Sequence, residues 1–311
     1  MVYALALIPV IGLLIFIYFN DKKEKEPIGL LLALFFTGMA TVISAIIAEV
    51  VGQVVVRIVA PNESVLRSIF IATMIVGPAE ELGKFLVLRL ITWKNRNFDY
   101  SYDAIVYAVF VSLGFALLEN IEYVFTGGLT AALVRMFSAV PGHACFAVFM
   151  GYFYGKAKYA SLTNAKGKCA LYTFLSMIVP IAIHGVYDAI LMAGRAMGED
   201  SVAGLAVLLW IGLVIALFVV SCILVVRSSK NDFCIVTLPD KAQTVYKPSI
   251  VGGWTCECGS QNQFNFCPKC GKQRPMESIW NCPKCGTVCT FKFCGNCGCQ
   301  RPSDPGQYRS I

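Results

Sequence analysis

Long apolar runs separated by short polar stretches fill the first two thirds of the chain. A helix needs roughly 20 apolar residues to cross the hydrocarbon core of a bilayer. Runs of that order lie at residues 2–19, 28–51, 66–92, 103–125, 131–155, 170–193 and 203–226. The first lacks a basic leader and a clear small-residue cleavage site, so we interpret it as a helix and not as a signal peptide. The pattern predicts an all-α polytopic membrane bundle with about seven transmembrane helices.

The composition agrees with this interpretation. Hydrophobic residues make up 57% of the chain and charged residues only 14%, whereas soluble domains carry about 25% charged residues. The mean hydropathy is +0.67. These values exclude an ordinary soluble domain for the first two thirds of the chain.

Lysine and arginine gather in alternate loops of the predicted bundle. Loops one, three and five and the start of the tail carry Lys22, Lys23, Lys25, Lys94, Arg96, Lys156, Lys158, Lys166, Lys168, Arg227 and Lys230, whereas the even loops carry Arg57, Arg67 and Arg195. Basic loops of membrane proteins stay in the cytosol. We therefore expect an integral protein of the cell membrane with its N-terminus outside and its C-terminal tail in the cytosol.

The tail divides into a linker and a repeated unit. Residues 227–253 are polar and contain prolines and a Gly252-Gly253 pair, which is typical of a linker. A cysteine motif that begins at Trp254 recurs from Trp280, with matching residues 26 or 27 positions apart. We expect a transmembrane protease domain at 1–226, a linker at 227–253, zinc ribbons at 254–276 and 277–303, and a short tail at 304–311.

The spacing of the cysteines predicts two structural zinc ions. Ten of the 14 cysteines follow residue 255, and in the reducing cytosol metal sites are favoured over disulfides. Zinc takes four thiolates from two tight turns, and the metal supplies the folding energy of units this small. We assign Cys256, Cys258, Cys267 and Cys270 to one ion and Cys282, Cys285, Cys294 and Cys297 to the other, which leaves Cys289 and Cys299 over.

Aromatic residues inside the ribbons bear on their partner. Phe264, Phe266, Phe291 and Phe293 occupy positions where small ribbon cores need aromatic side chains. Bases can also stack on such rings, but packing in the core accounts for these four without a ligand. We therefore expect the ribbons to contact a protein partner and not a nucleic acid.

Ionisable residues lie inside four of the apolar runs, where they are costly and usually functional. They are Glu80, Glu81 and Lys84 in the third run, Glu119 and Glu122 in the fourth, Arg135 and His143 in the fifth, and His184 and Asp188 in the sixth. Counted from the cytosolic helix ends at about 1.5 Å per residue, the glutamates and histidines lie roughly 16 to 24 Å deep. Residues at similar depth on separate helices predict a single buried polar site.

The residue types suit hydrolysis of a peptide bond. The reaction needs a base to activate water and a donor or metal to stabilise the oxyanion. Glu80 or Glu81 would be the base, and only one faces the water because successive helical residues point about 100° apart. Lys84 lies within reach of either glutamate. Asp188, one turn after His184, would orient that imidazole.

The pattern leaves open whether this site holds a metal. His143, His184 and Glu119 would form a catalytic zinc site with one open position. Without a metal, the two histidines would donate hydrogen bonds to the oxyanion. The candidate ligands come from different helices and no HExxH motif is present, so spacing does not separate these alternatives.

Four ordered motifs resemble the PrsW family of intramembrane proteases. They are Glu80-Glu81-x-x-Lys84, Phe115-Ala116-x-x-Glu119-Asn120-x-x-Tyr123, Pro141-Gly142-His143 and His184-x-x-x-Asp188. The likeness runs from about residue 5 to 195, and the family is similar to the CAAX prenyl proteases and the bacterial CPBP proteins.

The resemblance implies a glutamic-type or metal-assisted endopeptidase that makes the site-1 cut in a membrane-anchored anti-sigma factor. It places Glu80, Glu81, Glu119, His143, His184 and Asp188 in functional roles. The double zinc ribbon departs from a minimal family member and leaves the substrate open, because a recognition module can redirect the enzyme.

Two other functions are consistent with the sequence. Buried Glu and His residues also build proton relays, so a proton-coupled transporter is one alternative, although no inverted repeat is detectable. The other is a non-catalytic receptor or scaffold that acts through the ribbons. It predicts that the buried residues can be replaced without loss of function.

Overall fold

The computed structural model describes residues 2–198 and 200–236, and in the tail residues 254–262, 269–270, 272, 280–289, 293, 296 and 298–300. The chain forms two compact units, Met1–Leu238 and Pro239–Ile311. The first unit extends beyond residue 226, where the sequence placed its end. The division of the tail into two ribbons stays a prediction.

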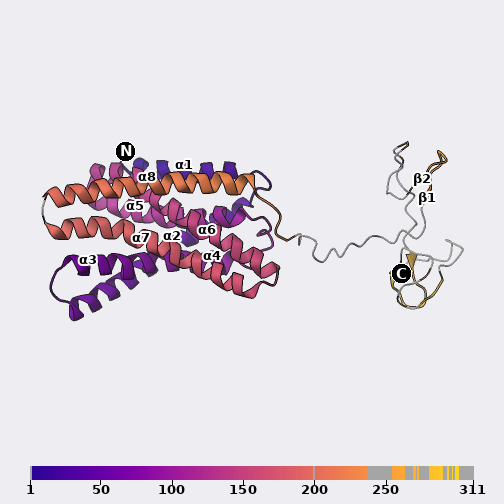
Figure 1. Cartoon of the computed structure of the whole chain (residues 1–311), viewed down its shortest axis with the longest axis horizontal. Helices are drawn as coiled ribbons and strands as arrows, with labels where there is room; N and C mark the ends of the chain where they lie inside the picture. Colours follow the sequence, from indigo (N-terminus) through magenta and orange to yellow (C-terminus); the bar gives the residue numbers. More distant parts are fainter. Residues whose placement is uncertain are drawn as a thin grey trace. The chain divides into compact units, whose positions relative to one another are not determined.

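The first unit is a bundle of helices, as predicted (Figure 1). Its elements are α1 Val2–Asn20, α2 Ile28–Val59, α3 Val65–Ile71, the π-helical η1 Ala72–Val76, α4 Gly77–Thr92, α5 Asp103–Phe137, α6 Ala139–Leu162, α7 Lys166–Met197 and α8 Asp200–Lys230. Among the described residues, four stretches are long and apolar enough to cross a membrane: Ile28–Val59, Asp103–Leu162, Lys166–Met197 and Val202–Lys230. The number of seven spans stays a prediction.

A π-helical turn interrupts the third predicted run immediately before the paired glutamates. The backbone N–H of Gly77 bonds to the carbonyl of Ala72, five residues back, and Pro78 follows without an N–H of its own. Such turns insert a residue into the helix and are frequent at functional sites. The turn rotates Glu80 and Glu81 relative to the helix that precedes them.

The fourth and fifth predicted runs differ from the structure at their junction. The loop expected at residues 126–130 corresponds to a break at Gly128, where φ is 62° and ψ is −146°, but the helical structure of α5 resumes beyond it and ends at Phe137. Only glycine adopts this conformation readily. Beyond the break the chain doubles back, because the guanidinium of Arg135 reaches the side chains of Asn120 and Glu119. Residues 129–137 therefore pack back against the part of α5 that precedes the break, and α6 begins only at Ala139.

Two glycines bring α2 and α5 into backbone contact. A methyl group at Gly38 would lie 2.0 Å from the carbonyl oxygen of Val111, and one at Gly114 would lie 2.0 Å from that of Phe35. Small residues allow helices to approach closely in membranes, where packing drives association. These contacts fix the distance between the backbones of α2 and α5 near Gly38 and Gly114.

We expect Gly38→Ala to destabilise the bundle, because the added methyl group collides with backbone that cannot rotate away. Unfolding of the purified protein in detergent should show a loss of about 1–3 kcal/mol. Gly29→Ala, in the same helix, is the matched control because nothing lies within 4 Å of its added methyl group. Equal stability of the two variants would contradict the proposed contact.

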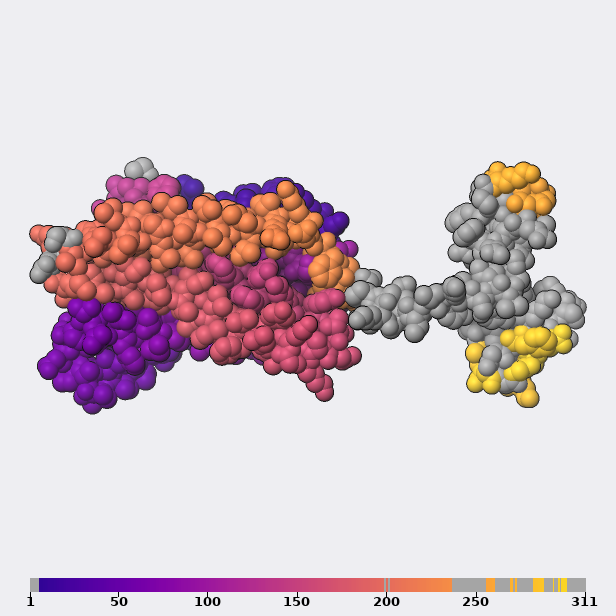
Figure 2. Space-filling model, in the orientation of Figure 1, coloured from indigo at the N-terminus to yellow at the C-terminus, as the bar shows by residue number. Residues whose placement is uncertain are grey.

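The outer surface of the bundle is apolar. Figure 2 shows α8 along the length of one face. Its exposed side chains include Leu205, Val207, Leu208, Leu209, Ile211, Ile215, Phe218, Val219, Val220 and Ile223. A continuous patch of this kind does not face water in a stable protein. It fits the hydrocarbon core of a bilayer, and the first unit is that of a membrane protein.

The segment after α8 packs on the loop before α5. Asp232 Oδ1 accepts hydrogen bonds from Ser101 Oγ at 2.8 Å and from the N–H of Tyr102 at 2.9 Å. Tyr100 and Cys234 form an antiparallel bridge, and Ile235 is fully buried. These contacts attach residues 232–235 to the helical unit.

The second unit contains two short hairpins. Strand β1 Trp254–Thr255 pairs with β2 Gln261–Asn262, and β3 Trp280–Asn281 pairs with β4 Val288–Cys289. Each hairpin turns at a glycine with positive φ, Gly259 at 79° and Gly286 at 72°. The internal repeat predicted from the sequence therefore appears as two similar hairpins.

Three cysteines in and after the first hairpin lie close together. One ligand atom from each of Cys256, Cys258 and Cys270 lies within 4.8 Å of the others, so this cluster could bind a metal ion. The fourth predicted ligand, Cys267, lies outside the described residues, as do Cys294 and Cys297 of the second ribbon. Cys282 is buried and Cys285 is exposed in the second hairpin.

Candidate active site

Four buried side chains meet inside the helical unit. Glu80 and Glu81 come from the first turn of α4, His143 from α6 and His184 from α7. One ligand atom from each lies within 4.8 Å of the other three. All four side chains are at most 5% exposed. The structure thus brings together residues that the sequence placed at a similar depth.

The ammonium group of Lys84 lies in the middle of this cluster. Its Nζ atom donates to Glu81 Oε1 at 2.8 Å and to Glu80 Oε2 at 3.1 Å. The same atom lies 3.1 Å from His143 Nδ1 and 3.8 Å from the centre of the Phe115 ring. Lys84 is fully buried. Its positive charge therefore compensates the negative charge of the two carboxylates at a place that water does not reach.

His143 connects the glutamate pair to α5. An ammonium group can only donate, so the Nδ1 atom that faces Lys84 must accept. The hydrogen of this ring then lies on Nε2, which donates to Glu119 Oε2 at 2.7 Å. Arg135 Nη2 lies 2.9 Å from the same carboxylate oxygen. This chain of contacts fixes both the tautomer and the orientation of His143.

His184 lies between two carboxylates. Its Nδ1 is 3.0 Å from Glu81 Oε1, and its Nε2 is 3.3 Å from Asp188 Oδ2. The ring of Phe146 stacks on it with centroids 4.6 Å apart. Asp188 therefore lies where the helical spacing predicted it, one turn beyond His184 and against its outer nitrogen.

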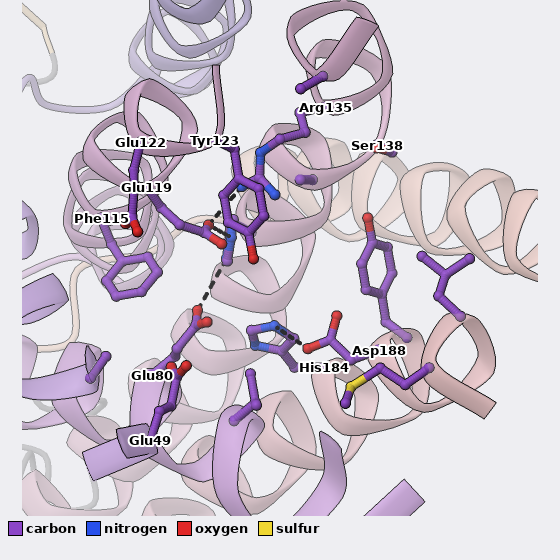
Figure 3. Close-up of a pocket in the computed structure, with 18 of the residues that line it drawn as sticks. Glu49, Glu80, Phe115, Glu119, Glu122, Tyr123, Arg135, Ser138, His184 and Asp188 are labelled. Carbon is purple, nitrogen blue, oxygen red and sulfur yellow. Dashed lines mark hydrogen bonds and ion pairs between the residues drawn. The ribbon is translucent and has the colours of Figure 1, made fainter. Parts of the chain in front are cut away.

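A cavity of about 790 Å³ opens on one side of the cluster (Figure 3). Glu80, Glu119, His143, His184 and Asp188 line it, whereas Glu81 and Lys84 do not. The π-helical turn and the first turn of α4 thus present Glu80 to the cavity and bury Glu81 behind it. Of the two adjacent carboxylates, Glu80 is the one that a substrate or water can reach.

Several residues that line the cavity were not predicted from the sequence. Glu49 and Gln53 of α2, Arg195 of α7 and Trp210 of α8 all border it. Glu49 is the clearest omission, because a carboxylate in an otherwise apolar run is itself a signal of function. The close-up in Figure 3 shows Glu49 beside Glu80. Arg135, one of the ionisable residues of the fifth apolar run, contacts the carboxylate of Glu119.

The donor set fits a divalent metal ion such as zinc. Two imidazoles and two carboxylates are the ligand types of catalytic zinc sites, and their ligand atoms lie close enough to share one ion. This set contains Glu80 and Glu81 in place of Glu119, which instead contacts His143 Nε2. A bound divalent ion and the ammonium of Lys84 would both supply positive charge to the same carboxylates, so the two would compete for this position.

Comparisons with known proteins identify relatives over most of the chain. The family model described as "PrsW family intramembrane metalloprotease" matches residues 26–255. Protease PrsW of Bacillus subtilis is 37% identical over 186 residues, which cover 60% of this chain and 80% of the relative. Protease PrsW of Oceanobacillus iheyensis is 36% identical and that of Geobacillus kaustophilus 34%, over 65% and 61% of this chain and 88% and 79% of the relatives. No solved structure matches the chain significantly.

Proposed function

The chain belongs to the PrsW family of intramembrane proteases, and we propose that it hydrolyses a peptide bond of a membrane-anchored regulatory protein with water activated by Glu80. A protease of this kind acts on a membrane protein. The observation that carries the proposal is the cavity in which Glu80 and both histidines are exposed to the same space. Membership of a protease family disfavours the transporter and the scaffold.

Glu80 is a better base than Glu81 because of what surrounds each carboxylate. Glu81 accepts from Lys84 at 2.8 Å and faces His184 at 3.0 Å, away from the cavity. Glu80 has a longer contact of 3.1 Å to Lys84 and lies 4.0 Å from His143 Nδ1, and it borders the cavity. A base must reach the proton that it removes. Glu81 therefore positions Lys84 and His184, and Glu80 takes the proton from water.

The remaining residues stabilise charge and hold the groups in place. His143 and His184 border the same cavity, and their Nε2–H groups would turn from Glu119 and Asp188 toward the developing oxyanion when substrate is bound. Glu119 and Asp188 orient these rings through the contacts already described. Glu81, His143 and His184 would hold a metal ion, and the chemistry that a bound ion supplies is polarisation of the scissile carbonyl or of the attacking water.

The substrate class follows from the family resemblance. We propose an anti-sigma-factor-like protein that is anchored in the membrane by one apolar segment and receives its first cut from this protease. The alternation of basic loops supports an N-terminus outside the cell and a cytosolic tail. The ribbons would then contact a cytosolic protein, and zinc is the metal that their cysteines favour.

The proposed function predicts cleavage by the purified full chain in liposomes. The test substrate is a protein with one transmembrane segment and a tagged outer domain. We expect release of the tag, with the cut mapped by mass spectrometry to the transmembrane segment or its outer boundary. Absence of any product from folded protein, with and without added zinc, would contradict the proposal.

Two zinc ions should accompany the tail. We expect elemental analysis of the intact chain to find two ions that are lost when the chain ends at residue 230, because the ribbon cysteines are the ligands. Cys256→Ser should remove one of them, whereas Cys169→Ser, a cysteine of α7 outside the cluster, should remove none. A third ion that stays with the helical unit and disappears in His184→Ala would indicate a metal at the active site.

A further inference from the structure

An apolar groove lies between α2 and α5 beside the catalytic cavity. Its volume is about 480 Å³, and it is lined by Val42, Ile43, Ile46, Leu118, Ile121, Glu122 and Phe125. Val42, Ile46 and Glu122 also line the catalytic cavity. The groove and the cavity therefore share a wall, and a molecule in the groove is adjacent to the space that Glu80 borders.

The glycine contacts explain why the two helices separate here. Gly38 and Gly114 hold the backbones of α2 and α5 close together. One turn further along α2, Val42 and Ala45 meet Phe115 and its neighbour Leu118, whose larger side chains hold the helices apart. The groove thus begins where the glycine contact ends.

The lining of the groove matches the interior of a bilayer. Ile43 is 63% exposed and Phe125 is 78% exposed in the isolated chain, although both lie on helices of the membrane unit. Every lining residue except Glu122 is apolar. Lipid tails solvate an apolar segment as well as an apolar groove does. The affinity of such a segment for the groove therefore comes from close packing of side chains.

We propose that the apolar transmembrane segment of the substrate lies in the groove between α2 and α5 and enters the catalytic cavity from there, past Val42 and Ile46. This inference rests on the proposed proteolysis. It makes Val42, Ile43 and Ile46 of α2, which lie outside all four sequence motifs, determinants of substrate binding.

Two features favour a protein segment over a lipid chain. The groove continues into a cavity lined by carboxylates and imidazoles, where a peptide backbone finds hydrogen-bond partners and an acyl chain finds none. Glu122, the one charged residue of the groove, also borders the cavity, so polar residues that follow an apolar segment meet a polar partner there.

Photo-crosslinking tests the contact directly. A benzoylphenylalanine residue replaces Ile43 in full-length protein that also carries Glu80→Gln, and the liposomes contain the tagged single-span substrate. We expect a covalent adduct with the transmembrane segment of the substrate. The control position is Leu209 of α8, which is 58% exposed and lines neither space. Adducts with lipid alone, or equal substrate adducts from both positions, would overturn the proposal.

Kinetics separate failure of the groove from failure of the proposed function. Ile43→Trp fills the groove, so we expect kcat/KM for the single-span substrate to fall at least tenfold, mainly through KM, whereas Leu209→Trp leaves it unchanged. An unchanged kcat/KM in Ile43→Trp would overturn the groove and leave the protease intact. No cleavage by the unmodified chain would overturn both.

Discussion

Replacement of Glu80 by glutamine is expected to lower the rate of peptide-bond cleavage by about a thousandfold or more. A positioned general base typically contributes roughly a hundredfold to ten-thousandfold. Glutamine keeps the shape of the side chain and its contact with Lys84, but it cannot accept a proton from water. Because Glu80 borders the cavity while Glu81 lies behind it, the loss should appear in kcat, with substrate binding retained.

The measurement is release of the tagged domain in liposomes, compared with the melting temperature of each variant. Glu63→Gln is the chemical control, because the side chain of Glu63 is 95% exposed on a loop, and it should cleave normally. Glu81→Gln should lose activity together with stability, since Glu81 holds both Lys84 and His184. Full activity in Glu80→Gln would exclude Glu80 as the base.

The sequence predicted the class of fold because apolar run length is a direct consequence of bilayer thickness. Each of the seven runs coincides with helical structure. What it missed depends on single residues. The sequence placed a loop at residues 126–130, but it did not predict the helical segment 129–137 that follows the positive φ of Gly128 and folds back on α5. A glycine that turns the chain and one that packs in a helix, such as Gly114, look alike in sequence.

The sequence singled out site residues that are unusual in their surroundings. His143, His184 and the glutamate pair stand out because charged groups are rare in apolar runs. Their contacts could not be predicted, since they depend on how α4 rotates after its π-helical turn. That rotation decides that Glu80 and not Glu81 borders the cavity. The sequence left the base open between Glu80 and Glu81, and we propose Glu80 because it borders the cavity.

Replacement of Lys84 by methionine should have the largest effect on stability. Lys84 is fully buried and its Nζ atom contacts Glu80, Glu81 and His143. Removal of one partner of a buried ion pair costs about 3–5 kcal/mol, because the other charge stays buried without compensation. Lys94→Met, at an exposed lysine beyond α4, is the matched control and should change the free energy of unfolding by less than about 0.5 kcal/mol.

Added zinc distinguishes the two possible sources of positive charge at this site, the ammonium group of Lys84 and a bound metal ion. If an ion can replace the ammonium group, added zinc should raise the melting temperature of Lys84→Met more than that of the unmodified protein, because it then binds the vacated carboxylates. His184→Ala in the same background should abolish that rise. Stabilisation by zinc in neither protein, together with full activity of the unmodified chain in a chelator, would mean that Lys84 is the cation that the glutamate pair requires and that Glu80 acts without a metal.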